Sequence, residues 1–220
     1  MSKKKNIDDY EEIKAILVGD SGVGKTNLIN TSVGIPFVEG KRPTISGSFV
    51  SKKIKADNDQ EFIVNLWDTA GQETYRDVTK LFFKGSEIIL LVYDITTKNS
   101  FESLKEWAKI SEDIIENEHI YGIVGNKNDL YLESKVSDDE VKDFADTLNA
   151  KFKLVSAKTD KQSFSDFLKD LVEDLKKIDK RRKRYSIKLN KNRENSNKTR
   201  CSGWFSKIFK KSDLSKEENK

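Results

Sequence analysis

Hydrophobic and polar positions follow two different periods along the first 178 residues, and these periods predict strands and helices in turn. Short apolar runs predict six strands, at residues 13–18, 49–56, 62–67, 88–93, 121–124 and 152–155. Apolar residues three and four positions apart predict helices at residues 101–115, 141–148 and 164–175. Strands that alternate with helices indicate a mainly parallel sheet. We therefore expect an α/β fold with a six-stranded, mainly parallel sheet and helices on both of its faces.

Local sequence distinguishes the strands from one another. Residues 57–60 (DNDQ) separate the second strand from the third and predict a hairpin turn. The second strand carries lysines at positions 52, 53 and 55, as expected at the edge of a sheet. The last three strands are predicted to be buried. The aromatic residues of the helices are interpreted as core residues: Phe101, Trp107, Phe144, Phe164 and Phe167.

The composition excludes several classes of protein. Of the 220 residues 35% are hydrophobic, mean hydropathy is −0.69, and no apolar run approaches the about 18 residues that span a bilayer. Residues 1–14 are charged and contain no apolar segment typical of a secretory signal. The single cysteine, Cys201, excludes a disulfide framework and a cysteine-rich zinc site. We expect a protein of the cytoplasm.

Charge is distributed unevenly along the chain. Residues 176–220 hold 17 of the 41 Lys and Arg residues and 5 of the 37 Asp and Glu residues, a net charge of +12. The remainder has a net charge of −8. Helical periodicity also stops after Ile178. We expect an N-terminal extension (1–11), one domain (12–178) and a basic tail (179–220), and two interpretations of the tail stay open: a solvated, disordered terminus or an anchor to an anionic partner.

A phosphate-binding motif follows the first strand. Residues 19–26 (GDSGVGKT) match G-x-x-x-x-G-K-[ST] between a strand and a helix, which is the context that the motif requires. Its backbone N–H groups are expected to bind phosphate oxygens, Lys25 the β- and γ-phosphates, and the Thr26 hydroxyl Mg²⁺. The predicted ligand is a nucleoside di- or triphosphate with magnesium. The binding residues are Ser21, Gly22, Val23, Gly24, Lys25 and Thr26.

A second motif predicts the base. Residues 126–129 (NKND) follow the fifth strand, at the edge where open sheets bind ligands. The Asp129 carboxylate can accept hydrogen bonds from guanine N1 and N2, whereas adenine offers no such pair of donors. A mismatch of this kind can reject an analogue by roughly 10⁴- to 10⁵-fold. After the last strand, the Ala157 N–H could bind guanine O6. The predicted base contacts are Asn126, Lys127, Asp129, Ser156, Ala157 and Lys158.

Residues 67–73 (WDTAGQE) complete a resemblance to the small GTPases of the Ras superfamily, and most of all to Rabs, over residues 14–178. The resemblance implies the P-loop NTPase fold of small G proteins. It also implies that Asp68 holds Mg²⁺ through water, that the Gly71 N–H meets the γ-phosphate, and that Gln72 orients the attacking water. Thr44 matches the threonine that ligates Mg²⁺ in the GTP state, and Phe37 matches the aromatic residue beside guanine.

The activity implied by the resemblance is that of a switch that binds GTP and GDP and hydrolyses GTP. We identify no arginine that acts in cis, so we expect slow hydrolysis, on the order of 10⁻⁴ to 10⁻³ s⁻¹, stimulated by an activating protein. A monomer that regulates vesicle or membrane trafficking, with an exchange factor and effectors, is the implied biology. The alternative is a nucleotide-bound scaffold that never cycles and acts through its tail.

Three aromatic residues match the effector surface of Rabs: Phe49, Trp67 and Phe82. The segment before them departs from the Rab pattern, because the usual I-G-x-D-F is replaced by ISGSF at residues 45–49. Compared with the usual pattern, this segment lacks the acidic residue, and its glycine stands one position later. The effector is therefore not identified by the sequence.

The tail also departs from the Rab pattern. Rabs carry prenylated C-terminal cysteines, whereas this sequence ends in KEENK and its one cysteine, Cys201, lies 19 residues earlier. Four apolar residues of the tail lie on one helical face, and lysines lie between them in the sequence. The four residues are Trp204, Phe205, Ile208 and Phe209. This segment resembles an interfacial anchor, which would lie on the cytosolic face of an endomembrane, and a disordered tail with no membrane role stays open as the alternative. Lipidation of Cys201 stays open, and nucleic acid is not expected as the partner.

Overall fold

Six strands form one sheet in the part of the chain that the computed structural model describes, residues 10–40, 44, 47–70 and 76–180. The chain divides into two units, Met1–Leu175 and Lys176–Lys220, and residues 176–180 of the second unit are helical. The first unit holds the sheet. The predicted amphipathic segment of the tail with Cys201, and most of the predicted N-terminal extension, lie outside the described residues.

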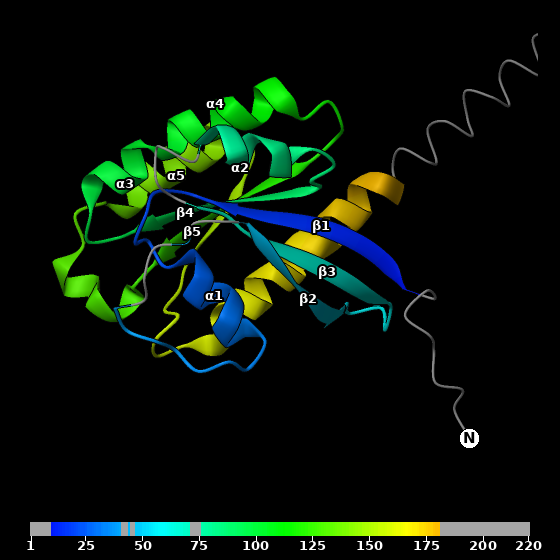
Figure 1. Ribbon diagram of the computed structural model, residues 1–220, viewed down its shortest axis with the longest axis horizontal. Helices are drawn as coiled ribbons and strands as arrows, with labels where there is room; N and C mark the ends of the chain where they lie inside the picture. The colour runs from blue at the N-terminus through cyan, green and yellow to red at the C-terminus, as the bar shows by residue number, and fades with distance from the viewer. Residues whose placement is uncertain (1–9, 41–43, 45–46, 71–75, 181–220) are drawn as a thin grey trace, which may run out of the picture. The chain divides into compact units, whose positions relative to one another are not determined.

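The sheet has the strand order β2-β3-β1-β4-β5-β6 (Figure 1). Only β2 and β3 pair antiparallel in this sheet of described residues, and every other neighbouring pair is parallel. This arrangement confirms the predicted α/β fold and the hairpin at residues 57–60. The strands are β1 (Glu11–Val18), β2 (Ser48–Lys55), β3 (Glu61–Asp68), β4 (Ile88–Asp94), β5 (Ile120–Asn126) and β6 (Lys151–Leu154).

Helices cover both faces of the sheet (Figure 1). On one face lie α1 (Lys25–Ser32) and the helix of residues 161–175, whose apolar side chains pack with those of β1 and β3. The other face is covered by α2 (Arg76–Phe83), α3 (Lys98–Glu102), α4 (Leu104–Ile114) and α5 (Asp138–Thr147). Because both faces are covered, the central strand β4 is buried along its whole length. The predicted core aromatic residues Phe101, Trp107, Phe144, Phe164 and Phe167 are buried.

Two details of the predicted elements were wrong. The helix predicted at 101–115 is divided into α3 and α4 at Ser103. The last strand was predicted to be buried, but the first three residues of β6 are exposed and Phe152 retains 36% exposure. The reason is that β6 lies at the end of the sheet and pairs only with β5. The edge position predicted for β2 is confirmed.

The parallel strands bring the loops that carry the motifs to one edge of the sheet. β1, β3, β4, β5 and β6 run in the same direction, so the loops that follow them meet at their carboxyl ends. These loops include residues 19–24, 69–70 and 127, and residues 155–160. The fold therefore explains why motifs more than 100 positions apart in the sequence converge. Among the described helices, none is both long and apolar enough to cross a membrane.

Candidate functional site

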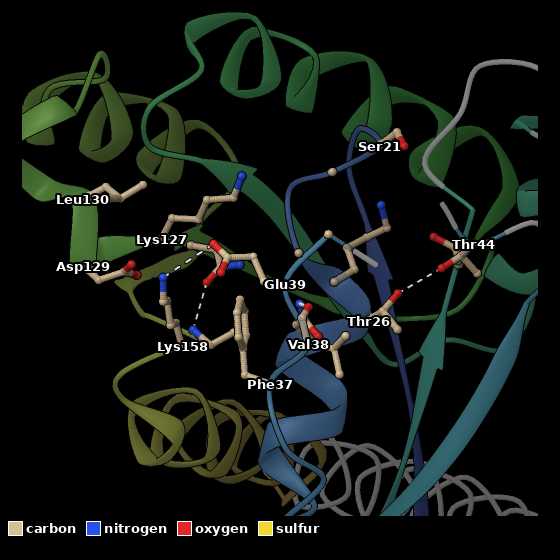
Figure 2. Close-up of a pocket in the computed structure, with 18 residues that line it drawn as sticks. Ser21, Thr26, Phe37, Val38, Glu39, Thr44, Lys127, Asp129, Leu130 and Lys158 are labelled. Carbon is tan, nitrogen blue, oxygen red and sulfur yellow. Dashed lines mark hydrogen bonds and ion pairs between the residues drawn. The ribbon is translucent and has the colours of Figure 1, made fainter. Parts of the chain in front are cut away.

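A pocket of about 480 Å³ opens at this edge, and Figure 2 shows the residues that line it. Ser21 and Thr26 lie toward one end, together with Thr44, whereas Lys127, Asp129 and Lys158 lie toward the other. Most of the residues predicted from the sequence line this pocket: Ser21, Gly22, Gly24, Lys25, Thr26, Phe37, Thr44, Asn126, Lys127, Asp129, Ala157 and Lys158.

The turn after β1 depends on two glycines. Gly19 has a φ of 144°, and a Cβ atom there would lie 2.0 Å from the Val92 carbonyl oxygen. Gly24 has a φ of 100°, and a Cβ atom there would lie 2.3 Å from Asn126 Nδ2. Any larger residue would force the turn away from β4 or β5. The glycines therefore keep this backbone against the ends of the central strands.

Lys25 is a buried cation at the start of α1. Its side chain is 5% exposed, and Nζ donates to the Gly19 and Asp20 carbonyl oxygens at 2.7 and 2.9 Å. Burial lowers the pKa of Lys25 to about 8, although the carboxylates of Asp68 and Asp20 act in the opposite direction. A cation held in this way is prepared to exchange neutral carbonyl partners for anionic ones.

Three side-chain oxygens meet at the amino end of α1. Thr26 Oγ1 donates to Asp68 Oδ2 at 2.7 Å and lies 2.9 Å from Thr44 Oγ1. Mg²⁺ prefers oxygen ligands at about 2.1 Å in an octahedron, whose neighbouring oxygens are about 3 Å apart. Two hydroxyls and one carboxylate at these separations fit such an ion, with water and phosphate as its remaining ligands. The chemistry and the spacing of the three donors thus suit magnesium.

Asn126 connects the two ends of the pocket. This residue is 2% exposed, its Nδ2 donates to the Val23 carbonyl oxygen at 2.8 Å, and its Oδ1 accepts the Ala157 N–H at 3.2 Å. Val23 itself is buried and is not among the lining residues. The Ala157 N–H that the sequence assigns to guanine O6 therefore donates to Asn126 here. Asn126 acts in this structure as a link between loops.

Ser156 holds the carboxylate at the base end. Its Oγ donates to Asp129 Oδ1 at 2.5 Å and accepts the N–H groups of Lys158 and Thr159. Ser156 is buried and is not one of the residues that line the pocket. Among the described residues, none donates a hydrogen bond to the second carboxylate oxygen of Asp129, Oδ2. Asp129 is therefore oriented by the protein and retains an acceptor for a ligand.

Lys127 has a left-handed backbone, with a φ of 68°, and its Nζ forms an ion pair with Asp94 Oδ2 at 2.5 Å. Burial by itself would raise the pKa of Asp94, but hydrogen bonds from Lys127 and Thr96 outweigh it and leave this pKa below its ordinary value. Asp94 therefore stays ionised and fixes the lysine. The sequence signal for Asp94 was its place at the end of an otherwise apolar strand, β4.

Sequence reasoning missed several lining residues. They come from α1, from the segment after it, from the loop after β3 and from the 3₁₀ helix Asn128–Glu133 that follows β5: Asn27, Val38, Glu39, Gly40, Thr69 and Leu130. Asn27 had a signal, because it directly follows Thr26 on the same helix. Residues 38–40 had none, since their position over the pocket depends on contacts with distant residues. Asp20 also has a distant partner, as its Oδ1 accepts the indole N–H of Trp107 at 3.3 Å.

Three aromatic rings form a separate surface. Phe49 and Trp67 stack with centroids 5.0 Å apart, and the Trp67 and Phe82 centroids are 5.4 Å apart. Phe49 is 54% exposed, and Lys14 Nζ lies 4.6 Å from the centroid of the Trp67 ring. The three residues predicted to form an effector surface are thus in contact. Gly71 and Gln72, predicted to act in hydrolysis, lie outside the described residues.

Comparison with known proteins gives consistent results. The sequence model of the Ras family matches residues 14–177. Ras-related protein RABA1h of Arabidopsis thaliana is 40% identical over 158 residues, which cover 71% of this chain and 72% of the relative. RabC of Dictyostelium discoideum is 35% identical over 194 residues, 87% of this chain and 98% of the relative. Human Rab-22A is 37% identical over 148 residues, 67% of this chain and 75% of the relative.

Proposed function

Because this chain belongs to the Ras family, whose members are small GTPases, we propose that it is a Rab-like switch that binds GDP and GTP in the 480 Å³ pocket. One observation carries the proposal. A single pocket gathers a buried lysine with a glycine turn, a cluster of hydroxyl and carboxylate oxygens, and an oriented carboxylate at the other end. These are the groups that the phosphates, the metal ion and the guanine of a nucleotide require.

At the phosphate end, Lys25 neutralises charge on the β- and γ-phosphates, and the backbone N–H groups of residues 21–26 donate to phosphate oxygens. Thr26, Thr44 and Asp68 would hold Mg²⁺, as the separations of their oxygens favour. When bound, the ion supplies positive charge to the β- and γ-phosphate oxygens.

At the base end, Asp129 accepts hydrogen bonds from guanine N1 and N2. Phe37 and the aliphatic stem of Lys127 border the base. Ser156 fixes the loop that carries Asp129, and Asn126 links the loops that carry Val23 and Ala157. Ala157 and Lys158 complete this end. The support for guanine is the orientation of Asp129 by Ser156 at 2.5 Å, together with the acceptor that Asp129 retains.

Hydrolysis of GTP to GDP and phosphate is proposed to proceed by in-line attack of water. Gln72 orients that water and the Gly71 N–H donates to the γ-phosphate, both by the resemblance to the family. Lys25 reduces the cost of the charge that develops on the phosphate oxygens. The sequence identifies no arginine that acts in cis, so we expect fast turnover to require an activating protein.

The switch is read by partners. In the GTP state Thr44 and Gly71 engage the γ-phosphate and order the segments around them, which is an order–disorder transition. Effectors bind Phe49, Trp67 and Phe82, because these rings are in contact with one another and the exposed ring of Phe49 can anchor a partner. We propose a role in vesicle trafficking on the cytosolic face of an endomembrane, with the basic tail at the anionic surface.

Single-turnover hydrolysis tests this function. Full-length protein loaded with GTP and Mg²⁺ should release phosphate at about 10⁻⁴ to 10⁻³ s⁻¹. Gln72→Leu should hydrolyse at least about tenfold more slowly while binding GTP unchanged, because it removes only the group that orients water. A wild-type rate above about 1 s⁻¹ would contradict the requirement for an activating protein. No hydrolysis at all would favour the scaffold that does not cycle.

The affinity for GDP should fall at alkaline pH. Burial lowers the pKa of Lys25 to about 8, so this amine is mostly neutral above pH 8. The phosphates of bound GDP favour the charged amine, so binding above this pH takes up a proton. Affinity should therefore be flat just below pH 8 and decline by as much as about tenfold per pH unit above it. Titration with fluorescent GDP from about pH 7 to 9.5 measures the profile, and the Lys25→Met variant should show none of the decline.

A further inference from the structure

The segment 37–40, which we call the strap, crosses the base end of the pocket. All four of its residues line the pocket: Phe37, Val38, Glu39 and Gly40. Figure 2 shows Phe37, Val38 and Glu39 between Thr26 on one side and Asp129 and Lys158 on the other. A nucleotide bound in this pocket would leave its base end only after the strap had moved. Contacts that hold the strap closed would therefore slow release.

The first such contact comes from α1. Asn27 Nδ2 donates to the Val38 carbonyl oxygen at 2.9 Å. The other atom of the same amide, Oδ1, is buried and accepts no hydrogen bond within the described residues. A carbonyl can accept only from the nitrogen, so the contact with Val38 determines the orientation of the amide. The hydrogen bond to the backbone of the strap is therefore what orients the Asn27 amide.

The second contact comes from the opposite side. Lys158 Nζ lies 3.6 Å from Glu39 Oε1, with the lysine side chain 49% and the glutamate side chain 81% exposed. An ion pair this exposed contributes little and is screened by salt. Phe37 adds packing, because its partly buried ring contacts the core between the sheet and α1. The Asn27–Val38 hydrogen bond is also solvent-exposed, but it joins neutral groups, so salt does not screen it as it screens the ion pair.

The position of Asn27 gives its contact a particular consequence. It directly follows Lys25 and Thr26 on α1, the two residues proposed to bind phosphate and magnesium. The hydrogen bond to Val38 therefore ties the strap to the helix that holds the phosphates. This geometry couples the two ends of the pocket through one side chain.

We propose that Asn27 is a positioning residue that fastens the strap over the bound nucleotide and thereby sets its residence time. This inference rests on the proposed function, since it takes a guanine nucleotide as the ligand. Glu39 and Lys158 form a weaker, salt-sensitive second fastening. An exchange factor that separates Val38 from Asn27 would open the base end of the pocket.

Release of fluorescent GDP from the full chain, chased with excess GDP in Mg²⁺, tests the proposal. Asn27→Ala should release the nucleotide about threefold to tenfold faster, the range expected for loss of one hydrogen bond. Asn30→Ala is the matched control, because Asn30 lies one turn further along α1 and no hydrogen bond of its side chain is seen among the described residues. Asn30→Ala should release GDP at the wild-type rate.

The dependence of GDP release on ionic strength distinguishes the Glu39–Lys158 ion pair from the Asn27–Val38 hydrogen bond. Glu39→Gln should speed release by at most about fivefold at low ionic strength, and this effect should vanish near 1 M salt. The effect of Asn27→Ala should persist at high salt, because no charge is removed. Hydrogen exchange provides a readout that a purely structural role would not produce. In Asn27→Ala loaded with GDP, exchange should rise in the peptide that covers 37–40 and stay unchanged in the peptide that covers 19–26.

The outcomes are distinct. Wild-type protein that fails to bind GDP overturns the proposed function. Protein that binds GDP, with Asn27→Ala releasing it at the rate of Asn30→Ala, overturns the role of Asn27 alone. Faster release together with faster exchange throughout residues 19–26 also overturns that role, because it would show general loosening of the site.

Discussion

Lys25→Met should weaken the binding of GDP by about 10²- to 10⁴-fold. The lysine is 5% exposed and its partners are two backbone carbonyls, so a bound phosphate would pair with a cation already removed from water. Removal of one partner from a buried charge pair costs about 3–5 kcal/mol, which corresponds to this loss of affinity. Methionine keeps most of the volume. Calorimetric titration of nucleotide-free protein with GDP and Mg²⁺ measures the change.

Two controls distinguish a loss of phosphate contact from a loss of folding. Burial disfavours the charged amine in the nucleotide-free protein, so its replacement should not lower the thermal midpoint of that form by more than a few degrees. Lys142→Met, at an exposed position of α5, should bind GDP as the wild type does. A loss of less than about tenfold for Lys25→Met would place the phosphates elsewhere.

Asp129→Asn should reverse the base preference of the protein. The carboxylate can accept from both N1–H and the N2 amine of guanine, whereas asparagine presents one acceptor and one donor. The Ser156 hydroxyl, 2.5 Å from Asp129 Oδ1, should hold the amide oxygen at this position and turn the NH₂ group toward the ligand. That NH₂ group would repel the guanine amine but donate to the C2 carbonyl of xanthine. We expect affinity for GDP to fall by about 10³-fold or more.

Competition between GDP and xanthosine diphosphate measures this preference directly. The wild type should prefer GDP, and Asp129→Asn should prefer xanthosine diphosphate. Asp139→Asn, an exposed change in α5, should keep the wild-type preference. If Asp129→Asn bound both nucleotides poorly, the residue would support the loop without reading the base. If it still preferred GDP, another residue would determine specificity.

Local sequence was sufficient for much of the fold and for the two ends of the site. The six strands and the hairpin follow from short apolar runs and turn residues, whose preferences act over a few positions. Lys25 and Asp129 were found in the same way, because each belongs to a motif of fixed spacing beside a strand. Their meeting at one edge of the sheet also follows, since parallel strands end on the same side.

Tertiary structure decided what connects these parts. Asn126 contacts the Val23 carbonyl 103 positions away, and Glu39 meets Lys158 across the pocket. The exposure of β6 depends on the place of that strand in the sheet, a detail for which the sequence prediction was wrong.

The physical reason for this division is that a sequence pattern reflects only interactions between residues that are near one another in the chain. Burial and turn geometry are set by near neighbours and leave a period in the sequence. A hydrogen bond between distant loops leaves none, because it depends on how strands and helices pack. The sequence by itself therefore determined the fold class, the phosphate turn and the carboxylate for the base, whereas packing alone placed residues 38–40 of the strap and their tie to Asn27.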